Sequence, residues 1–296
     1  MHADEIVVTT TQVRALVAEQ LPQLGHLTVS KLDTQGTVNA IFRLGEIFAA
    51  RFPLRADDPS QVATWLQREA AAASELAECS PVPVPKPIHI GDPGHGYPLP
   101  WAVQTWVDGT PATPDGAADA TGLAHDLVVF IGALRHGDTR GRRFSGGGRG
   151  GTLSDHDSWM QECFRQSASV IDIPPLRRLW SKFRLLRRDC RDVMSHTDLT
   201  PGNILVTDGR LAGVLDGGGY GPADPALDLV CAWHLLAPGP REALRRGLRC
   251  SDLEWERGRA WAFEQAMGAY WYYLDSNPAM SLMGKTTLGR ILEEQG

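Results

Sequence analysis

Hydrophobic positions in the first third of the chain repeat mostly at the short period of β-strands, with two helical stretches among them. Val13, Leu16 and Val17 recur at helical spacing, which predicts a helix over 9–24 with a threonine cap. An alanine-rich helix is predicted at 61–79. Strands are predicted at 27–32, 35–45, 46–55, 87–98 and 101–109. A sheet accompanied by few helices is typical of a small α+β lobe.

The rest of the chain follows the longer period of α-helices. The connecting segment 79–87 carries four prolines and therefore cannot be helical. Helical spacing then predicts helices at 117–136, 155–169, 175–191, 224–236, 242–248 and 253–274. The pattern indicates a sheet-rich first part followed by a larger helical part.

A predicted hairpin interrupts the helical part between Asn203 and Asp216. Ile204 to Val206 form a short apolar run that is typical of a buried strand, and Leu211 to Leu215 form the return strand. Asp208-Gly209 between them is a strong turn signal. Pairing of the two strands would bring Asn203 and Asp216 together at the open end of the hairpin.

Three polar side chains around this hairpin have the spacing of a kinase catalytic centre. Asp198 precedes Asn203 by five residues, and Asp216 follows Asn203 by thirteen. Pro201 and Gly202 shape the loop so that Asp198 can face the same point. Asp198 could accept a proton from a substrate hydroxyl, while Asn203 and Asp216 supply the hard oxygen ligands that Mg²⁺ requires.

Two other interpretations of these residues remain open. Aspartate and asparagine beside glycine and proline are common turn formers. A metal-dependent hydrolase is the second alternative, because side chains able to bind a metal gather in this region: His196, Asp198, Asp216, Asp224 and Asp228. The agreement of spacing, hairpin and flanking sequence favours the kinase interpretation.

Residues 140–151 form a basic stretch with six glycines in twelve positions, which is typical of a mobile loop. Such a loop could be a phosphate cradle, a lid over the substrate or a plain linker. A phosphate cradle usually lies between a strand and a helix. Because this stretch lies between two predicted helices, we favour a linker or a lid.

The composition is that of an ordinary globular protein, with 43% hydrophobic and 22% charged residues in 296 positions. No apolar run is long enough to span a bilayer, and the first ten residues lack the features of a signal peptide. We therefore expect a cytoplasmic protein without a membrane partner.

The five cysteines are scattered and form no CxxC pair, which argues against a zinc or disulfide framework and fits reduced thiols. The net charge of −6 argues against a nucleic-acid partner and is compatible with a cationic small molecule.

Two segments resemble a known family. Residues 195–206 read SHTDLTPGNILV, and residues 211–230 read LAGVLDGGGYGPADPALDLV. They are similar to the patterns HGDLHPGNILV and IDFGDAGVGDPALDL of the aminoglycoside phosphotransferase family, which are small-molecule kinases. The resemblance implies that Asp198 is the catalytic base and that Asn203 and Asp216 bind Mg²⁺.

The same resemblance implies an α+β, two-lobed protein-kinase-like fold. It places a nucleotide-binding lobe at 1–104 and a hinge at 105–109. A helical lobe at 110–296 would carry the catalytic loop and the acceptor site.

The resemblance also implies an ATP or GTP site in the first lobe. The loop containing Thr37 occupies the place of the nucleotide-binding loop. Arg51 stands where kinases have a phosphate-binding lysine, and Glu69 is placed to pair with it. The adenine ring would bond to the backbone at about Thr105 and Val107.

Two departures from the family pattern keep a catalytically weak, nucleotide-binding relative open as an alternative. Arg51 replaces the lysine and keeps its charge, but a guanidinium is planar and longer. Gly217 replaces the phenylalanine that often follows the metal-binding aspartate.

By resemblance, His196 is expected to bond to the backbone near Asp216. Asp224 and Asp228 are expected to cap a helix or to neutralise buried arginines and backbone donors.

The resemblance implies phosphoryl transfer to a hydroxyl of an antibiotic, such as an aminoglycoside or macrolide, or of a small metabolite alcohol. A cationic acceptor would need a carboxylate-lined cleft. Five carboxylates on the predicted helices could line it: Asp155, Asp157, Glu162, Glu264 and Asp275. Aromatic residues that could stack on an acceptor are Trp261, Trp271, Tyr272 and Tyr273, although such residues more often pack between helices.

Overall fold

The computed structural model describes residues 6–32, 39–55 and 58–294, and these residues fold into two compact units. The first unit holds the described residues within 1–78, 84–108 and 216–218. The second holds 79–83, 109–215 and the described residues from 219 onward. Segment 216–218 therefore packs with the first unit, although its chain neighbours on both sides belong to the second.

The first unit is built on a five-stranded antiparallel sheet with the order β1-β2-β3-β5-β4. Its strands are β1 (Val29–Lys31), β2 (Asn39–Leu44), β3 (Phe48–Pro53), β4 (Pro87–Gly91) and β5 (Trp101–Thr105). Its helices are α1 (Thr10–Gln20) and α2 (Pro59–Cys79). Strand β3 is central, and Arg51 on it is paired with Ile41 on one side and Ala102 on the other.

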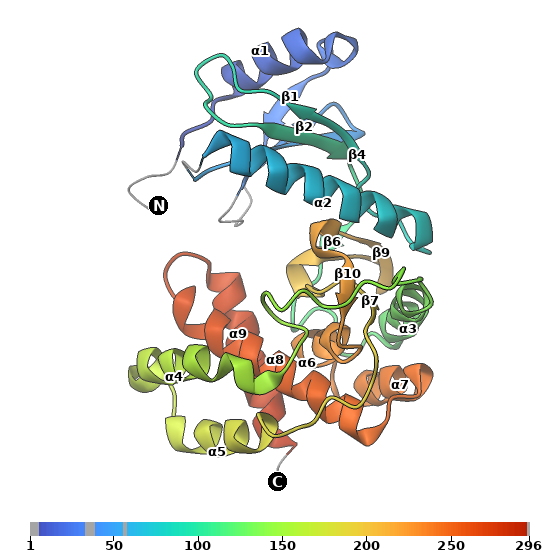
Figure 1. Ribbon diagram of the computed structural model, residues 1–296, viewed down its shortest axis with the longest axis vertical. Helices are drawn as coiled ribbons and strands as arrows, with labels where there is room; N and C mark the ends of the chain where they lie inside the picture. Colours follow the sequence, from blue (N-terminus) through green and yellow to red (C-terminus); the bar gives the residue numbers. More distant parts are fainter. Residues whose placement is uncertain (1–5, 33–38, 56–57, 295–296) are drawn as a thin grey trace. The chain divides into compact units, whose positions relative to one another are not determined.

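One apolar core holds this unit together. In β2, burial alternates from residue to residue, and the Phe42 side chain on the inner face is fully buried. Phe52 of β3 stacks on Trp101 of β5 with ring centroids 5.1 Å apart. Helices α1 and α2 contribute Leu16 and Leu66 to the same core, and both helices lie against the strands in Figure 1. The sheet and its two helices thus give Arg51 a rigid support.

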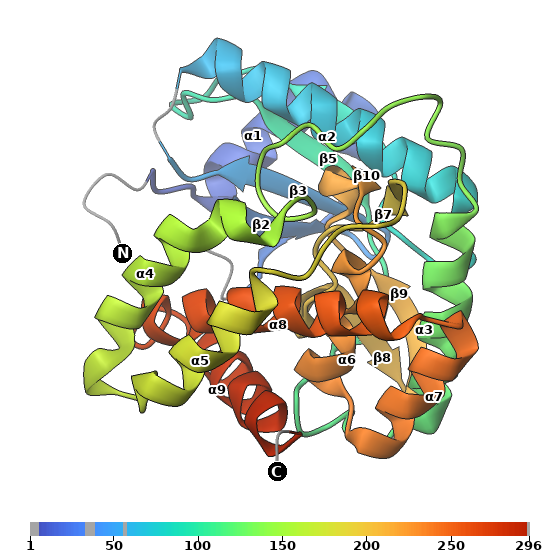
Figure 2. The same ribbon diagram turned by 60° about the horizontal axis from the view of Figure 1, so that its bottom comes forward.

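The second unit is mainly helical. Its helices are α3 (Thr121–Arg135), α4 (Asp157–Gln166), α5 (Ile173–Phe183), α6 (Val230–Leu235), α7 (Pro238–Leu248), α8 (Asp252–Tyr272) and α9 (Pro278–Glu293). Helix α8 crosses the unit with α4, α5, α6 and α9 packed around it, as Figure 2 shows. Residues on nearly every side of α8 are buried, which is typical of a helix at the centre of a core.

Short strands complete the second unit. Strands β6 (Thr110–Pro111), β8 (Ile204–Thr207) and β9 (Arg210–Val214) form one antiparallel sheet, and β7 (Val193–Ser195) pairs with β10 (Gly221–Ala223). The predicted hairpin is confirmed, because β8 and β9 pair directly. Asp208 and Gly209 both have positive φ angles, 51° and 72°, as a tight hairpin turn requires.

Three short strands and one helix were not predicted from the sequence: β6, β7, β10 and α9. Helix α9 carries recognisable signals, because the Asn277 side chain caps its start and Pro278 occupies its first turn. Its buried positions Met283, Leu288 and Ile291 recur at roughly helical spacing. The three strands are only two or three residues long, which is too short for a periodic pattern.

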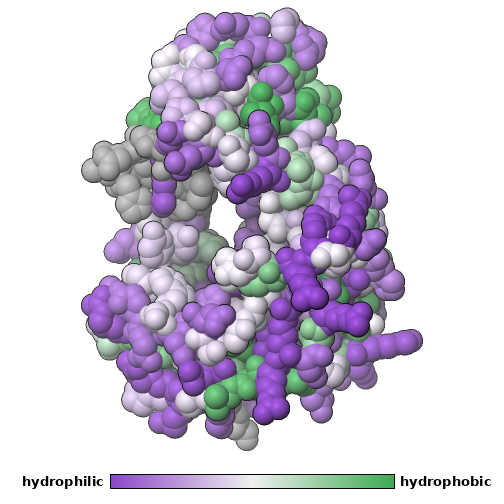
Figure 3. All heavy atoms as spheres, viewed as in Figure 1, coloured by the Kyte–Doolittle hydropathy of each residue, from purple (hydrophilic) through white to green (hydrophobic). Residues whose placement is uncertain are grey.

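The surface of the second unit is predominantly hydrophilic on the face drawn in Figure 3, with hydrophobic atoms in scattered patches. Among residues 6–32, 39–55 and 58–294, no helix is long and apolar enough to cross a membrane.

Candidate active site

The loop between β7 and β8 is held by hydrogen bonds that its own sequence supplies. His196 pairs through Nε2 with the carbonyl of Leu215 at 2.9 Å, as expected for a structural residue. The backbone N–H groups of His196 and Thr197 donate to the buried carboxylate of Asp228, at 2.9 and 3.0 Å. Asp228 therefore satisfies backbone donors, and the predicted structural role is confirmed.

Thr197 occupies a conformation that favours glycine. Its φ is 75°, which is an uncommon and strained value for a β-branched residue. Its hydroxyl donates to the carbonyl of Gly219 at 3.2 Å and helps to hold this conformation. The family pattern often has glycine at this position, and glycine adopts such a positive φ without a steric clash. Strain of this kind, of roughly 1–3 kcal/mol, is typical of functional loops.

The Asp198 carboxylate is oriented by two amide groups. Asn203 Nδ2 donates to Asp198 Oδ2 at 2.9 Å and to the Asp198 carbonyl at 3.0 Å. Gln265 Nε2, on helix α8, donates to Asp198 Oδ1 at 3.1 Å. The Asp198 side chain remains 38% exposed, so a substrate hydroxyl can reach it. Both the position and the accessibility suit a general base.

Gln265 is itself positioned by a buried chain of hydrogen bonds that the sequence did not reveal. His234 Nε2 pairs with Gln265 Oε1 at 2.8 Å, and His234 Nδ1 pairs with Thr287 Oγ1 at 2.9 Å. Since the Gln265 oxygen can only accept, His234 donates from Nε2 and accepts from the threonine at Nδ1. This fixes the Gln265 amide with its donor end toward Asp198.

The buried His234 should make the stability of the protein depend on pH. Burial lowers the pKa of His234 to about 4, whereas an unfolded histidine titrates near ~6.5. Below pH ~6.5 the histidine of the unfolded chain binds a proton, whereas the buried histidine of the folded protein stays neutral. The free energy of unfolding therefore falls as the pH drops. We expect His234 to account for a loss of about 2 kcal/mol between pH 7 and pH 5.

Urea unfolding at these two pH values, for the wild type and His234→Gln, measures this loss. The wild type should lose about 2 kcal/mol more than the variant, whose side chain does not titrate. An equal loss in both proteins would contradict the assignment.

A cationic group from the glycine-rich stretch lies beside Asp198. Arg149 Nη2 is 3.7 Å from Asp198 Oδ1, and Arg149 Nη1 is 3.9 Å from Glu264 Oε2. Glu264 is nearly fully buried on α8 and also contacts His156 at 2.9 Å. The hydrogen bond to Glu264 raises the pKa of His156, which favours its protonated form. Sequence reasoning missed Arg149 because the stretch 140–151 carried no periodic signal.

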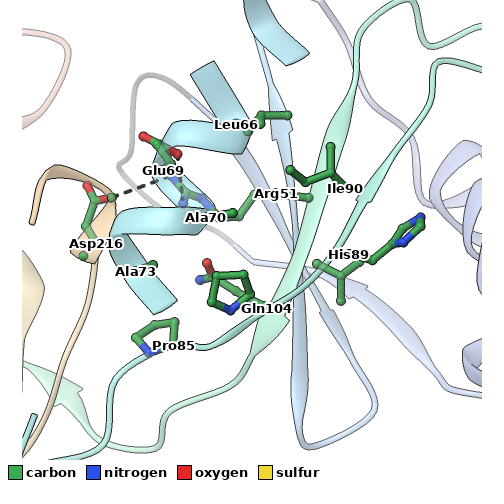
Figure 4. Close-up of a pocket in the computed structure, with 15 residues that line it drawn as sticks. Arg51, Leu66, Glu69, Ala70, Ala73, Pro85, His89, Ile90, Gln104 and Asp216 are labelled. Atoms are coloured by element: carbon green, nitrogen blue, oxygen red, sulfur yellow. Dashed lines mark ion pairs between the residues drawn. The ribbon is translucent and has the colours of Figure 1, made fainter. Parts of the chain in front are cut away.

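The first unit presents a second cluster, around Arg51. Its guanidinium lies 3.5 Å from Glu69 Oε2 on α2 and 3.7 Å from Asp216 Oδ1. Figure 4 shows the three side chains pointing toward one another beside a small cavity of about 30 Å³. Burial raises the pKa of Glu69; the charge of Arg51 opposes the rise and that of Asp216 adds to it. The predicted pairing of Arg51 with Glu69 is confirmed, whereas its role toward a nucleotide stays a prediction.

The glycines after Asp216 are required by close packing against α2. A Cβ atom on Gly217 would lie 2.5 Å from Leu76 Cδ2, and one on Gly218 would lie 2.8 Å from Glu69 Cγ. Leu76 therefore fills the space beside Gly217. Asp216 itself has a φ of 60°, in the left-handed region that aspartate tolerates better than most residues.

The remaining nucleotide predictions have different outcomes. Thr37 lies outside the described residues. The N–H of Thr105 donates to the carbonyl of Lys86 at 2.9 Å, so it is not available to a base. Val107 lies just after β5 and is buried. The backbone contact to adenine stays a prediction for Val107, and for Thr105 it can involve only the carbonyl.

The side chains of Asn203 and Asp216 fit the requirements of Mg²⁺. Both bonds from Asn203 Nδ2 go to Asp198, so the amide oxygen is turned away from that residue. The Asp216 carboxylate is 49% exposed and lies 3.7 Å from the Arg51 guanidinium, so a metal ion can reach its oxygens. Amide and carboxylate oxygens are the ligands this ion prefers.

The metal-hydrolase alternative loses its support. Asp224 is fully buried and paired with Arg257, Asp228 accepts from backbone groups, and His196 is bonded to a carbonyl. In the described part of the chain, no three His, Cys, Asp or Glu side chains are grouped as metal ligands.

Two hollows adjoin Asp198 in the second unit, and both are also lined by Arg149. The aromatic hollow, of about 370 Å³, has these side chains among its walls: Arg149, Trp159, Asp198, Gln265, Tyr272 and Tyr273. The glycine-rich hollow, of about 390 Å³, is lined by the loop glycines and by Arg143, Phe144, Arg149, Thr197 and Asp198.

The expected carboxylates do not line either hollow. Asp157 pairs with Arg184, Glu162 pairs with Arg165, and Glu264 is buried beneath Arg149. Of the expected aromatic residues, Tyr272 and Tyr273 do line the aromatic hollow. Trp261 instead lies in the core and donates to Asp224, while Trp159 is a lining residue that the sequence did not identify.

The chain resembles a known protein family in sequence and several solved structures in fold. A sequence profile of the phosphotransferase enzyme family matches residues 32–261. No curated protein sequence matches the chain significantly. The fold is similar to that in the GDP and kanamycin complex of APH(2")-IIia, with a TM-score of 0.73 and 18% identity, over 96% of this chain and 99% of that one.

Two further solved structures are similar. Macrolide 2'-phosphotransferase MphH from Brachybacterium faecium has a TM-score of 0.63 and 18% identity, over 92% of this chain and 97% of that one. The gentamicin complex of APH(2")-IIa has a TM-score of 0.62 and 14% identity, over 96% of this chain and 97% of that one. The likeness confirms the predicted α+β, kinase-like fold.

Proposed function

The chain belongs to the phosphotransferase enzyme family, and we propose that it transfers the γ-phosphoryl group of Mg²⁺-bound ATP or GTP to a hydroxyl of a small molecule. The observation that carries this proposal is the orientation of Asp198 by the amides of Asn203 and Gln265. A carboxylate that is fixed in this way and still exposed can receive a hydroxyl proton.

Asp198 would act on the acceptor. Its carboxylate takes the proton from the acceptor hydroxyl as that oxygen forms its bond to the γ phosphorus. The bond between the γ phosphorus and the bridging oxygen breaks, and the nucleoside diphosphate leaves with the bonding electrons. Because such transfers depend on positioning and electrostatic stabilisation, the fixed orientation of Asp198 accounts for much of its effect.

Arg51, Asn203 and Asp216 would act on the nucleotide. Asn203 and Asp216 would hold the Mg²⁺ ion, which neutralises phosphate charge when bound. Arg51 would bind the phosphate tail, and Glu69 would hold the arginine in place, as the 3.5 Å pair supports. Asp216 is now the counter-ion of Arg51, so metal binding would free the guanidinium for phosphate.

The acceptor class comes from relatives. The similar structures include complexes with kanamycin and gentamicin and a macrolide phosphotransferase, so antibiotic hydroxyls are candidate acceptors for this chain too. A small metabolite alcohol is the alternative. A binding protein with weak catalysis is a second candidate function, and the observation favouring it is the arginine at position 51.

Replacing Asp216 with alanine should weaken binding of the Mg²⁺-nucleotide complex by at least about tenfold, because one of its two proposed protein ligands is lost. Affinity for the nucleotide measured in EDTA should not fall, because without the metal the variant loses only a counter-ion of Arg51. Calorimetric titration with and without Mg²⁺ separates the two effects. The assignment is wrong if the variant keeps the Mg²⁺ dependence of the wild type.

The function itself is tested by a screen for nucleotide consumption. ATP and GTP are each supplied with Mg²⁺ and with a panel of aminoglycosides, macrolides and small alcohols. We expect consumption that depends on one class of acceptor. Nucleotide binding without consumption for any acceptor would favour the binding-protein alternative.

A further inference from the structure

The charges around Asp198 are not those of a site for a polycation. Among the described residues that line the aromatic and glycine-rich hollows, Asp198 is the only carboxylate, while Arg143 and Arg149 are cations. A further carboxylate beside Arg149, that of Glu264, is nearly fully buried and is shared between Arg149 and His156. An incoming ammonium group would therefore meet at least as much positive as negative charge.

The Arg149 guanidinium makes no short hydrogen bond to a carboxylate in the described part of the chain. Its closest carboxylate contacts, at 3.7 and 3.9 Å, are ion pairs beyond ordinary hydrogen-bond length. Its buried Nε has no hydrogen-bond partner among the described residues. The side chain is one-third exposed at the wall of both hollows. A neutral or anionic oxygen of a ligand could accept from this guanidinium at little cost.

The aromatic side chains that line the aromatic hollow are held by close packing. The Trp159 ring lies against the backbone of α8 at Gly268, where a Cβ atom would be 2.8 Å from Trp159 Cζ2. Trp271 packs between Trp159 and Tyr272, with ring centroids 6.0 and 5.5 Å away. Trp159 and Tyr272 are 39% and 45% exposed, so a ligand in this hollow can reach both rings.

We propose that the acceptor is a hydroxyl compound with an apolar ring and no positive charge, and that Arg149 is the residue that selects against cationic acceptors. This inference rests on the proposed function, because it takes Asp198 as the group that meets the hydroxyl. The ring packs on Trp159 and Tyr272, the hydroxyl reaches Asp198, and an oxygen of the acceptor accepts from Arg149.

A matched series of probes tests the charge preference. The probes are phenyl β-D-glucopyranoside, its 4-carboxy analogue, its 4-aminomethyl analogue and kanamycin. The three glycosides share the phenyl ring and the hydroxyl groups and differ in charge, whereas kanamycin is a polycation without that ring. Calorimetric titration without nucleotide measures their binding. We expect the neutral and anionic glycosides to bind at least about tenfold more tightly than the aminomethyl glycoside and kanamycin.

Variants at position 149 test the role of the arginine. Arg149→Gln should remove most of the difference between the neutral and the aminomethyl glycoside, whereas Arg149→Lys should keep it. Arg178→Gln makes the same chemical change on the exposed face of α5 and should keep the wild-type ranking. Thermal unfolding of each variant checks that the protein is folded.

Three results would overturn the inference. They are equal or tighter binding of a cationic probe to the wild type, no binding of the two favoured probes at millimolar concentration, and an unchanged ranking in folded Arg149→Gln. The titration contains no nucleotide, so it is independent of phosphoryl transfer. If the ranking fails while nucleotide consumption persists, the acceptor class is wrong and the enzymatic function stands.

Discussion

Replacing Asp198 with asparagine should lower the turnover number by about 10²–10⁴-fold and leave nucleotide affinity nearly unchanged. The variant keeps the size of the side chain and one of its two acceptor oxygens, so it can still accept from Asn203 or from Gln265. The bond from Asn203 to the backbone carbonyl of this residue is unaffected, so the loop geometry should persist. The variant loses the negative charge that takes the proton, together with one of the two amide bonds to the side chain. Steady-state kinetics with a responsive acceptor, together with calorimetric titration of the nucleotide, separates the two quantities.

Asp119→Asn is the matched control for this prediction. Asp119 is exposed in the same unit, before α3, so the identical change there should leave turnover unaffected. Near-wild-type turnover in Asp198→Asn would show that Asp198 is not the base. A parallel loss of nucleotide affinity would instead point to damage to the loop.

Removing the Asp224 carboxylate should destabilise the protein by about 3–5 kcal/mol. Asp224 is fully buried and bonds to Arg257, which is also buried, and it accepts from Trp261 Nε1 at 3.2 Å. Arg257 also donates to the carbonyls of Leu186 and Gly151, so this pair joins three segments of the second unit. Asp224→Ala would leave a buried guanidinium without its counter-ion.

Chemical denaturation of three proteins measures this effect. The double variant Asp224→Leu/Arg257→Met should be more stable than Asp224→Ala, because it buries no uncompensated charge. A loss below about 1 kcal/mol in Asp224→Ala would show that water or another group neutralises Arg257. The nucleotide affinity of the folded fraction should not change, because Asp224 is not a proposed ligand.

The parts of the site that could be predicted from the sequence are those determined by local structure. The β8–β9 hairpin follows from two short apolar runs and the Asp208-Gly209 turn, whose positive φ angles only a few residues adopt easily. Asp198 and Asn203 lie within one short loop, so their contact was encoded in their spacing. The pairing of Arg51 with Glu69 came from the resemblance to a family rather than from any local pattern.

The contacts that could not be predicted join residues far apart in the sequence. Gln265 reaches Asp198 from α8, and Arg149 reaches it from a glycine-rich stretch without periodicity. Side-chain chemistry alone also misled the prediction of the acceptor site. Asp157 and Glu162 had the charge to bind a cation, but each is paired with an arginine of the protein itself. Which arginine pairs with each carboxylate depends on how the helices pack.

The central claim is that the protein moves the γ-phosphoryl group from a nucleotide to an acceptor hydroxyl. The most direct measurement incubates the protein with Mg²⁺, γ-labelled ATP and the acceptor panel, and follows the label. We predict a labelled phosphate ester of one acceptor class, formed in equal amount with ADP and lost in Asp198→Asn. Strong thermal stabilisation by the nucleotide, with no labelled product from any acceptor and no hydrolysis above background, would contradict the claim.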